Sequence, residues 1–166
     1  ILKLVAQQPF EDQGVYFQVT RGVAKRDHAF PKDATPTVFM MSNPLPQLTA
    51  AQVEDGVACH TVPDTRWHRC HVKSISLLGN VLARQFASER GGVEAIMLRD
   101  GYLSEASASN VFCVIDGKLV SPPKDNLMLG GITLDGVWEL AAANGVPREM
   151  RRVSEAELRA ADEIWL

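Results

Sequence analysis

The sequence predicts a mixed α/β (α+β) fold, and three patterns indicate this class. Runs of alternating apolar and polar residues, rich in β-branched and aromatic side chains, are typical of strands. Two Asp-Gly pairs, Asp100-Gly101 and Asp116-Gly117, lie between such runs and indicate tight hairpins. Two longer segments have helical periodicity and end at glycines. Since the helices and strands follow one another irregularly, we expect a mixed sheet rather than a regular parallel β-α-β arrangement.

The first third of the chain contains two expected strands and a break. The strands are GVYFQVTRGVA (14–24) and TPTVFMMSN (35–43). The next segment, NPLPQLT (43–49), has two prolines and little periodicity, which indicates a linker between two structural units. After it we expect a strand around 56–62, a Pro-Asp turn, and a second extended piece that reaches residue 72.

The remaining elements have clear start and stop signals. A helix is expected over 75–90, where a Gly-Gly pair ends it, and a second over 133–143, which a nearby Gly and Pro end. Ser154 with Glu157 three residues later forms a capping box, which predicts a short helix. A last strand follows, and the chain ends within it at DEIWL. Because the chain also begins without Met, we expect a fragment that lacks both ends of a larger protein.

Composition limits the function classes. With 46% hydrophobic and 22% charged residues, the 166-residue chain has the composition of a globular protein with a real core. A net charge of −3 gives no basic field for nucleic acid or anionic lipid, and no apolar run is long enough to cross a bilayer. Three cysteines are too few for a disulfide framework, so we expect a cytoplasmic location.

Lys73 is the first candidate for chemistry, because it lies among apolar and small residues at the expected start of a helix. Desolvation of an ammonium group favours the neutral amine, which is a nucleophile and forms a Schiff base with a carbonyl cofactor such as pyridoxal phosphate. Alternatively, the side-chain stem lies over the helix start and the charged group stays in water. The lysine alone does not decide between these interpretations.

Two further features match what such a cofactor needs, and a third matches what its substrate needs. The glycine turn LGGIT (129–133) before a helix offers backbone N–H groups to a phosphate. Glu105, among small residues, offers a carboxylate to a pyridine nitrogen. Arg26 and His28, two residues apart in an extended segment, would project to the same side and bind a substrate carboxylate. Each feature also has an ordinary interpretation: a strand-to-helix turn, a solvated glutamate and a polar loop.

Four segments together carry a family resemblance: YFQVTRGVAKRDHAFP, RCHVKSISLLGNVLARQFA, LSEASASNVFCV and LGGITLDGVWELA. They resemble the fold-type IV (class IV) pyridoxal-phosphate aminotransferases, and most closely the D-amino acid aminotransferase branch. The resemblance covers about 14–166. It implies a D-amino acid aminotransferase-like fold with two domains: 1–44 as the C-terminal part of a small domain, 45–49 as a linker, and 50–166 as a larger cofactor-binding domain, incomplete at its C-terminus.

The resemblance also implies roles for individual residues. Lys73 matches the catalytic lysine that forms the Schiff base and moves the substrate proton, and Glu105 matches the carboxylate on the pyridine nitrogen. The remaining cofactor-binding positions match a phosphate-binding helix start, a side chain that supports the ring, and the small-residue segment after the glutamate: Ile132 and Thr133, Leu129, and Ser109, respectively. No metal is implied. The neighbouring Ala108 departs from the serine that relatives often have.

Substrate binding in this family involves the neighbouring subunit. Arg26 and His28 match the pair that binds the substrate α-carboxylate in the D-specific branch, and they reach in from the partner, which implies a homodimer. The family's phosphate-binding arginine, the carboxylate-holding tyrosine and the C-terminal phosphate loop have no match in this chain. The implied activity is ping-pong transamination of D-amino acids such as D-alanine with a 2-oxo acid such as 2-oxoglutarate.

Other functions stay open. A branched-chain L-amino acid aminotransferase or an aminodeoxychorismate lyase of the same fold type would keep Lys73 and Glu105, but neither is expected to present Arg26 and His28. A zinc module is a different class of alternative, since five potential ligands lie within thirteen residues: Cys59, His60, His68, Cys70 and His71. A catalytically inactive remnant with a structural role is a third.

Overall fold

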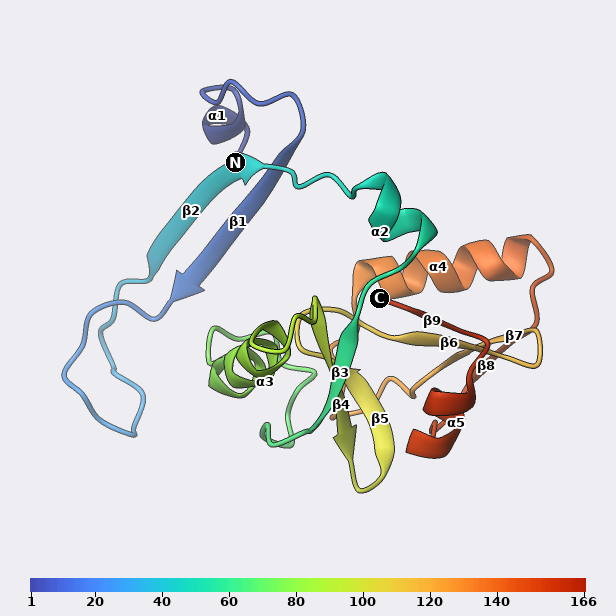
Figure 1. The fold of residues 1–166 in the computed structure, drawn as a ribbon. Helices are drawn as coiled ribbons and strands as arrows, with labels where there is room; N and C mark the ends of the chain where they lie inside the picture. Colours follow the sequence, from blue (N-terminus) through green and yellow to red (C-terminus); the bar gives the residue numbers. More distant parts are fainter. The chain divides into compact units, whose positions relative to one another are not determined.

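The computed structural model describes all 166 residues, and the chain divides into two compact units, Ile1–Asp55 and Gly56–Leu166 (Figure 1). The domain limits that the sequence suggests, 1–44, 45–49 and 50–166, stay a prediction.

The first unit is a two-stranded ribbon with two short helices. Helix α1 (Leu2–Val5) precedes strand β1 (Gln13–Thr20), which pairs antiparallel with β2 (Thr37–Pro44). Helix α2 (Ala50–Glu54) follows, and it begins at Thr49, whose side chain accepts the backbone N–H of Gln52 in a capping box. Neither helix is among the expected elements, although Thr49 and Gln52 are spaced as a capping box in the sequence.

Strand β1 ends earlier than its sequence pattern suggests. The expected strand 14–24 stops at Thr20, and Gly22 has a φ of 93°. A Cβ atom at Gly22 would lie 1.8 Å from the carbonyl oxygen of Thr35, so the chain turns closely past its own backbone there. Residues 21–36 therefore form a loop.

The second unit contains two mixed sheets (Figure 1). In the first, β3 (Cys59–Pro63) runs parallel to β4 (Glu94–Arg99), and β4 pairs antiparallel with β5 (Tyr102–Ala106). Helix α3 (Leu78–Ser88) connects β3 to β4. The second sheet has the order β8-β7-β6-β9, where β7 and β8 are parallel and the other pairs antiparallel. Its strands are β6 (Phe112–Ile115), β7 (Lys118–Ser121), β8 (Arg148–Met150) and β9 (Glu163–Trp165).

Both predicted Asp-Gly hairpins are confirmed. Asp100-Gly101 connects β4 to β5, and Asp116-Gly117 connects β6 to β7. All four residues have positive φ, between 50° and 79°. This is the conformation of the type I′ turn, whose twist matches that of the flanking strands.

The two sheets share a hydrophobic core. Buried side chains of β4, β5, β6, β7 and helix α5 (Glu155–Ala160) form one cluster, which includes Ile96, Val111, Val120 and Leu158. Helix α4 (Ile132–Ala143) packs through Leu134 and Ala141 on Phe112 and Leu119 of the second sheet. The core therefore fixes β5 and the start of α4 within one unit.

The segment between β3 and α3 differs from its expected form. Residues 64–77 contain no strand, so the extended piece expected to reach residue 72 is wrong, and α3 begins at Leu78 rather than at 75. The backbone N–H of Cys70 donates to the Asn126 carbonyl (2.8 Å), and that of Val72 donates to the Arg69 carbonyl (3.1 Å). These bonds bend the chain where the alternating pattern suggests a straight strand. None of the helices is long and apolar enough to span a membrane.

Candidate active site

Asp64 anchors a buried polar cluster at the end of β3. Its side chain is fully buried, and its carboxylate receives the Arg66 guanidinium through Nε and Nη2, both at 2.9 Å. The Arg66 backbone N–H (3.1 Å), the Arg99 Nη2 (3.0 Å) and the Ser104 hydroxyl (2.8 Å) also donate to this carboxylate. The Asp64 carboxylate thus joins strands β4 and β5 to the segment after β3.

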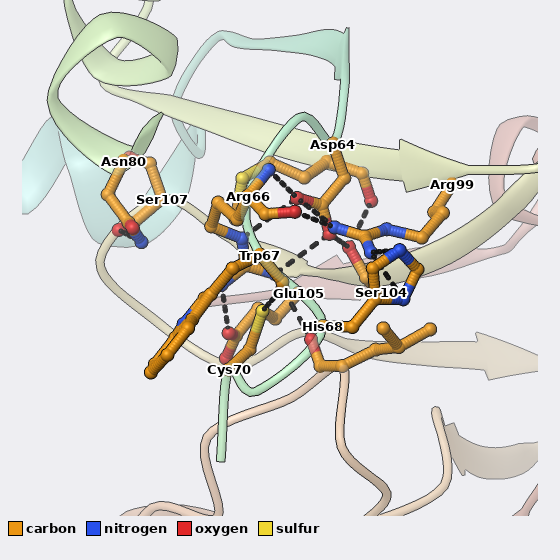
Figure 2. Close-up of polar contacts among 12 residues, drawn as sticks. Asp64, Arg66, Trp67, His68, Cys70, Asn80, Arg99, Ser104, Glu105 and Ser107 are labelled. Carbon is orange, nitrogen blue, oxygen red and sulfur yellow. Dashed lines mark hydrogen bonds and ion pairs between the residues drawn. The ribbon is translucent and has the colours of Figure 1, made fainter. Parts of the chain in front are cut away.

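Glu105 of β5 lies on the other side of the same guanidinium. Figure 2 shows Arg66 between Asp64 and Glu105, with its Nη1 paired to Glu105 Oε1. The other oxygen, Oε2, accepts the Asn110 side-chain amide and the Leu129 backbone N–H, each at 3.2 Å. Glu105 is only 5% exposed. The interpretation of this residue as a solvated glutamate is therefore wrong.

Burial and the neighbouring charges act in opposite directions on the two carboxylates. Burial raises the pKa of Glu105, while the hydrogen bond and charge of Arg66 oppose the rise. Burial also works against the charge on Asp64, but its several bonds to Arg66 hold the pKa of that carboxyl well below its usual range. Asp64 and Glu105 together balance Arg66 and Arg99, so the cluster carries no net charge when both carboxylates are ionised.

The glycine turn before α4 lies beside Glu105. The Asn110 amide that donates to Glu105 also donates to the Leu129 carbonyl (2.9 Å), and Arg66 Nη2 donates to the Leu127 carbonyl (3.1 Å). Helix α4 begins after Gly131 without a side-chain cap, so the backbone N–H groups at its start are available. A Cβ atom at Gly130 would meet nothing within 4 Å. The turn therefore leaves open space next to free donors, as a phosphate requires.

The predicted phosphate-binding residues Ile132 and Thr133 are the first two residues of α4, and both are exposed. Leu129 reaches Glu105 through its backbone N–H. The structure thus brings these three positions and Glu105 into one neighbourhood.

Ser109 has a structural partner of its own. Its hydroxyl donates to the buried Glu94 (3.2 Å), which also accepts the Ser107 hydroxyl and pairs with Arg84 (3.1 Å). The Asn80 amide holds the same turn through the Ser107 carbonyl (2.8 Å). Ser109 therefore helps to fix the turn after β5, and its contact with a cofactor stays a prediction.

Lys73 lies in the irregular segment before α3 and is exposed. Its apolar sequence neighbours Ile75, Leu77 and Leu78 are also exposed, so they do not enclose its side chain. The argument that Lys73 is desolvated by these residues is therefore wrong for this chain taken alone, and the amine is accessible to a ligand.

Arg26 and His28 lie in the loop between β1 and β2, and both are exposed. The extended conformation expected for them is wrong, because the Asp27 carboxylate accepts the backbone N–H groups of His28 (2.6 Å) and Ala29 (3.3 Å) and bends the chain. These residues belong to the first unit, whereas the other predicted site residues belong to the second.

Sequence reasoning missed the residues that surround Glu105. Asp64 and Arg66 are two apart directly after a strand, a spacing that could have indicated a pair on one side of the chain. Arg99 and Asn110 gave no sequence signal, since only the fold brings them to the cluster. The structure contains no group of three or more His, Cys, Asp or Glu side chains placed to hold a metal ion, and the three cysteines are unpaired.

The mixed α/β fold thus places a buried carboxylate beside a glycine turn that opens a helix without a side-chain cap. The sequence then identifies the family. Residues 1–166 match the model of the amino-transferase class IV family, so the chain belongs to the class IV aminotransferases.

Relatives with known names support the same assignment. The D-alanine aminotransferase of Bacillus licheniformis is 39% identical over 155 residues, which are 93% of this chain and 54% of the relative. The D-alanine aminotransferase of Listeria monocytogenes is also 39% identical, over 99% of this chain and 57% of the relative. The chain therefore spans about half the length of these curated relatives.

Solved structures confirm the predicted fold class. A hypothetical aminotransferase from Mycobacterium tuberculosis, in a form with bound α-ketoglutarate and PMP, has a TM-score of 0.80 and 25% identity, over 99% of this chain and 59% of that one. The branched-chain amino acid aminotransferase of Escherichia coli also matches, with a TM-score of 0.75 and 27% identity over 90% of this chain and 52% of that one. The 4-amino-4-deoxychorismate lyase of Pseudomonas aeruginosa matches with a TM-score of 0.77 and 31% identity, over 90% of this chain and 57% of that one. The chain thus has the architecture of the fold-type IV aminotransferases.

Proposed function

We propose that the protein is a pyridoxal-phosphate-dependent transaminase that acts on D-amino acids such as D-alanine, with a 2-oxo acid such as 2-oxoglutarate as acceptor. The observation that carries this proposal is the buried Glu105 carboxylate, fixed by Arg66 beside the open glycine turn of α4. The identity of 39% to D-alanine aminotransferases supports the substrate class.

The residues present fit the proposed cofactor. Glu105 offers a buried anion for a ring nitrogen, the N–H groups at Ile132 and Thr133 offer donors for a phosphate, and Gly130 leaves space beside them. A relative from M. tuberculosis has been solved in a PLP-bound form. When bound, pyridoxal phosphate supplies an aldehyde that reacts with amines and a ring that accepts electron density.

Each proposed residue has a distinct task. Lys73 Nζ, accessible in the segment before α3, would take a proton from the substrate Cα and later return it, as a general base and then a general acid. Glu105 would favour a protonated ring nitrogen through its negative charge. Ser109 would contact the cofactor from the turn after β5, and Leu129 would support the ring.

Arg26 and His28 are proposed to bind the substrate α-carboxylate through charge-assisted hydrogen bonds. Following the family resemblance, we place them at the active site of a neighbouring subunit in a homodimer. A cytoplasmic location is proposed on the same basis and agrees with three unpaired cysteines.

A second candidate function comes from the structural neighbours. The E. coli and P. aeruginosa proteins with TM-scores of 0.75 and 0.77 are a branched-chain amino acid aminotransferase and a 4-amino-4-deoxychorismate lyase. Either activity would use the same cofactor residues, so the cofactor alone does not discriminate among the three.

Steady-state kinetics with the complete gene product would separate these functions. The rate of 2-oxo acid formation is measured with D-alanine and with L-leucine, each with 2-oxoglutarate, and pyruvate formation is measured with aminodeoxychorismate. We expect kcat/KM for D-alanine to exceed that for L-leucine at least tenfold, about 1.4 kcal/mol of transition-state discrimination. A preference for L-leucine would support the branched-chain alternative, and pyruvate from aminodeoxychorismate would support the lyase. A protein inactive in all assays would be a remnant.

A further inference from the structure

The buried cluster around Arg66 suggests how Glu105 is held. Arg66 is joined to Asp64 by two side-chain bonds, to the Leu127 carbonyl by a third and to Glu105 by a fourth. Its side chain is only 7% exposed, so few other orientations are open to it. The planar guanidinium presents several donors in fixed directions, which a lysine ammonium does not.

The hydrogen bonds to Glu105 do not use all of its acceptor positions. An ionised carboxylate accepts about four hydrogen bonds, roughly two at each oxygen. Oε2 already accepts two donors, the Asn110 amide and the Leu129 N–H, whereas Oε1 accepts one, from Arg66. One acceptor position is therefore unused, and it is on the oxygen that Arg66 holds.

We propose that Arg66, aimed by Asp64, is a positioning residue that keeps Glu105 ionised and turns the free acceptor position of Oε1 toward the ring nitrogen of the cofactor. This inference rests on the proposed function for the identity of that ligand. The link between Arg66 and Glu105 does not depend on any ligand, so it can be tested separately.

Charge balance explains why Arg66 and not Arg99 has this role. The charged groups that act on Glu105 are Arg66 and Asp64. The Cys70 thiol is the other titratable group nearby, and the charges of the whole cluster act on it. Without Arg66, Asp64 keeps Arg99 and the Ser104 hydroxyl. Glu105 keeps only the two neutral donors at Oε2 and no cation. The buried charge that loses its partner is thus on Glu105.

The first test uses the protein without cofactor. We would measure unfolding of the wild type, Arg66→Met, Glu105→Gln and the double variant from pH 5 to pH 8. In Arg66→Met, an unpaired buried Glu105 takes up a proton on folding, so its stability deficit is smallest near pH 5 and grows as the pH rises. In the Glu105→Gln background this pH dependence should be lost. A deficit independent of pH, and equal in both backgrounds, would overturn the proposal.

Arg159→Met is the matched control for loss of an arginine ion pair. Arg159 of α5 pairs with Glu155 and also donates to the Thr61 hydroxyl of β3 (2.9 Å), but none of its hydrogen bonds or ion pairs reaches Asp64, Arg66 or Glu105. Its substitution is expected to leave the pH dependence of the wild type unchanged. If it reproduced the behaviour of Arg66→Met, the effect would be a general one of surface charge and the proposal would be overturned.

The second test uses the protein loaded with pyridoxal phosphate and the variant Arg66→Lys. This variant keeps the positive charge but loses the planar set of donors that the guanidinium presents. We expect kcat for D-alanine to fall at least about tenfold while KM changes less than about threefold, because Arg66 acts on Glu105 and not on the substrate. A kcat within about twofold of the wild-type value would overturn the positioning role. If only the proposed function is wrong, the wild type will be inactive, but the pH-dependent stability deficit of Arg66→Met and its loss in the Glu105→Gln background will still be observed.

Discussion

Gly131 lies against Asn110, and the contact links the start of α4 to the candidate active site. A Cβ atom at Gly131 would lie 2.5 Å from Asn110 Oδ1, while the amide nitrogen of the same side chain bonds both Glu105 and the Leu129 carbonyl. The backbone at Gly131 does not itself need a glycine, because its φ of −87° is open to any residue. It is the neighbouring Asn110 side chain that favours a residue without a Cβ atom.

Gly131→Ala is therefore expected to displace Asn110 and to lower the free energy of unfolding by about 1–3 kcal/mol, the range for an overpacked site. Urea denaturation measures this loss. Gly130→Ala is the matched control, because nothing lies within 4 Å of its added Cβ, and its effect should be below about 0.5 kcal/mol. Equal effects of the two substitutions would show that the contact with Asn110 does not matter.

The same pair of variants examines the proposed phosphate site. If the phosphate lies in the space at Gly130, Gly130→Ala should weaken binding of pyridoxal phosphate at least about tenfold although the protein stays stable, because the added methyl group takes up space beside the helix start. Equilibrium dialysis measures the Kd. An unchanged Kd would place the phosphate elsewhere.

Arg26→Ala is expected to raise KM for D-alanine at least about tenfold, since it removes one charge-assisted hydrogen bond to the substrate carboxylate. Steady-state kinetics would measure this change. The exposed neighbour Lys25 provides a control, and Lys25→Ala should leave KM within about twofold. A KM for D-alanine that does not respond to Arg26→Ala would argue against the proposed D-specific carboxylate site.

The capping box of α5 predicts a pH effect on stability. Hydrogen bonds from the Ser154 hydroxyl and backbone N–H, together with Arg151, lower the pKa of Glu157 from 4.5 to about 2. Since the pKa is lower in the folded protein, the stabilisation is complete above about pH 4.5 and is lost as the pH falls toward 2.

Glu157→Gln should therefore be less stable than the wild type at pH 6, and the difference should shrink as the pH is lowered to 2. Thermal unfolding at several pH values measures it. The exposed Glu139→Gln of α4 serves as a control and should change the stability by less than about 0.5 kcal/mol. A difference for Glu157→Gln that stays constant from pH 6 to pH 2 would contradict the assigned cause.

Met97→Ala tests the core that supports β4 and β5. Met97 is 1% exposed and packs with Val62, Ala87 and Ala95, so truncation should cost about 2–5 kcal/mol in the free energy of unfolding. Leu140→Ala on α4, where the side chain is 64% exposed, should cost much less. Similar losses for the two variants in urea denaturation would show that Met97 does not lie in a tightly packed core.

Local sequence signals predict the local structure well. Both Asp-Gly hairpins, the capping box at Ser154 and the glycine-opened helix α4 depend on a few adjacent residues, and the structure contains each of them. The four resembling segments also predict the fold class. The small residues around Glu105 draw attention to it in the sequence, and the structure shows that it is buried.

The parts that sequence reasoning missed depend on distant or competing contacts. The bend after Thr20 is set by the approach of Gly22 to Thr35, which is distant in the sequence but adjacent in space. The pairing of Arg66 with Glu105 spans 39 positions and carries no periodic signal. The sequence neighbours of Lys73 suggest that it is desolvated, but Ile75, Leu77 and Leu78 are themselves exposed.

We propose that Lys73 and Glu105 serve a pyridoxal-phosphate transaminase that uses D-amino acids. The most direct measurement is the visible absorption spectrum of the purified complete gene product, with pyridoxal phosphate supplied, before and after addition of D-alanine. We expect a yellow band that bleaches with D-alanine in the wild type but not in Lys73→Ala, which lacks the amine proposed to take the Cα proton. A wild-type protein without the band, or a band that responds to L-leucine but not to D-alanine, would contradict this proposal.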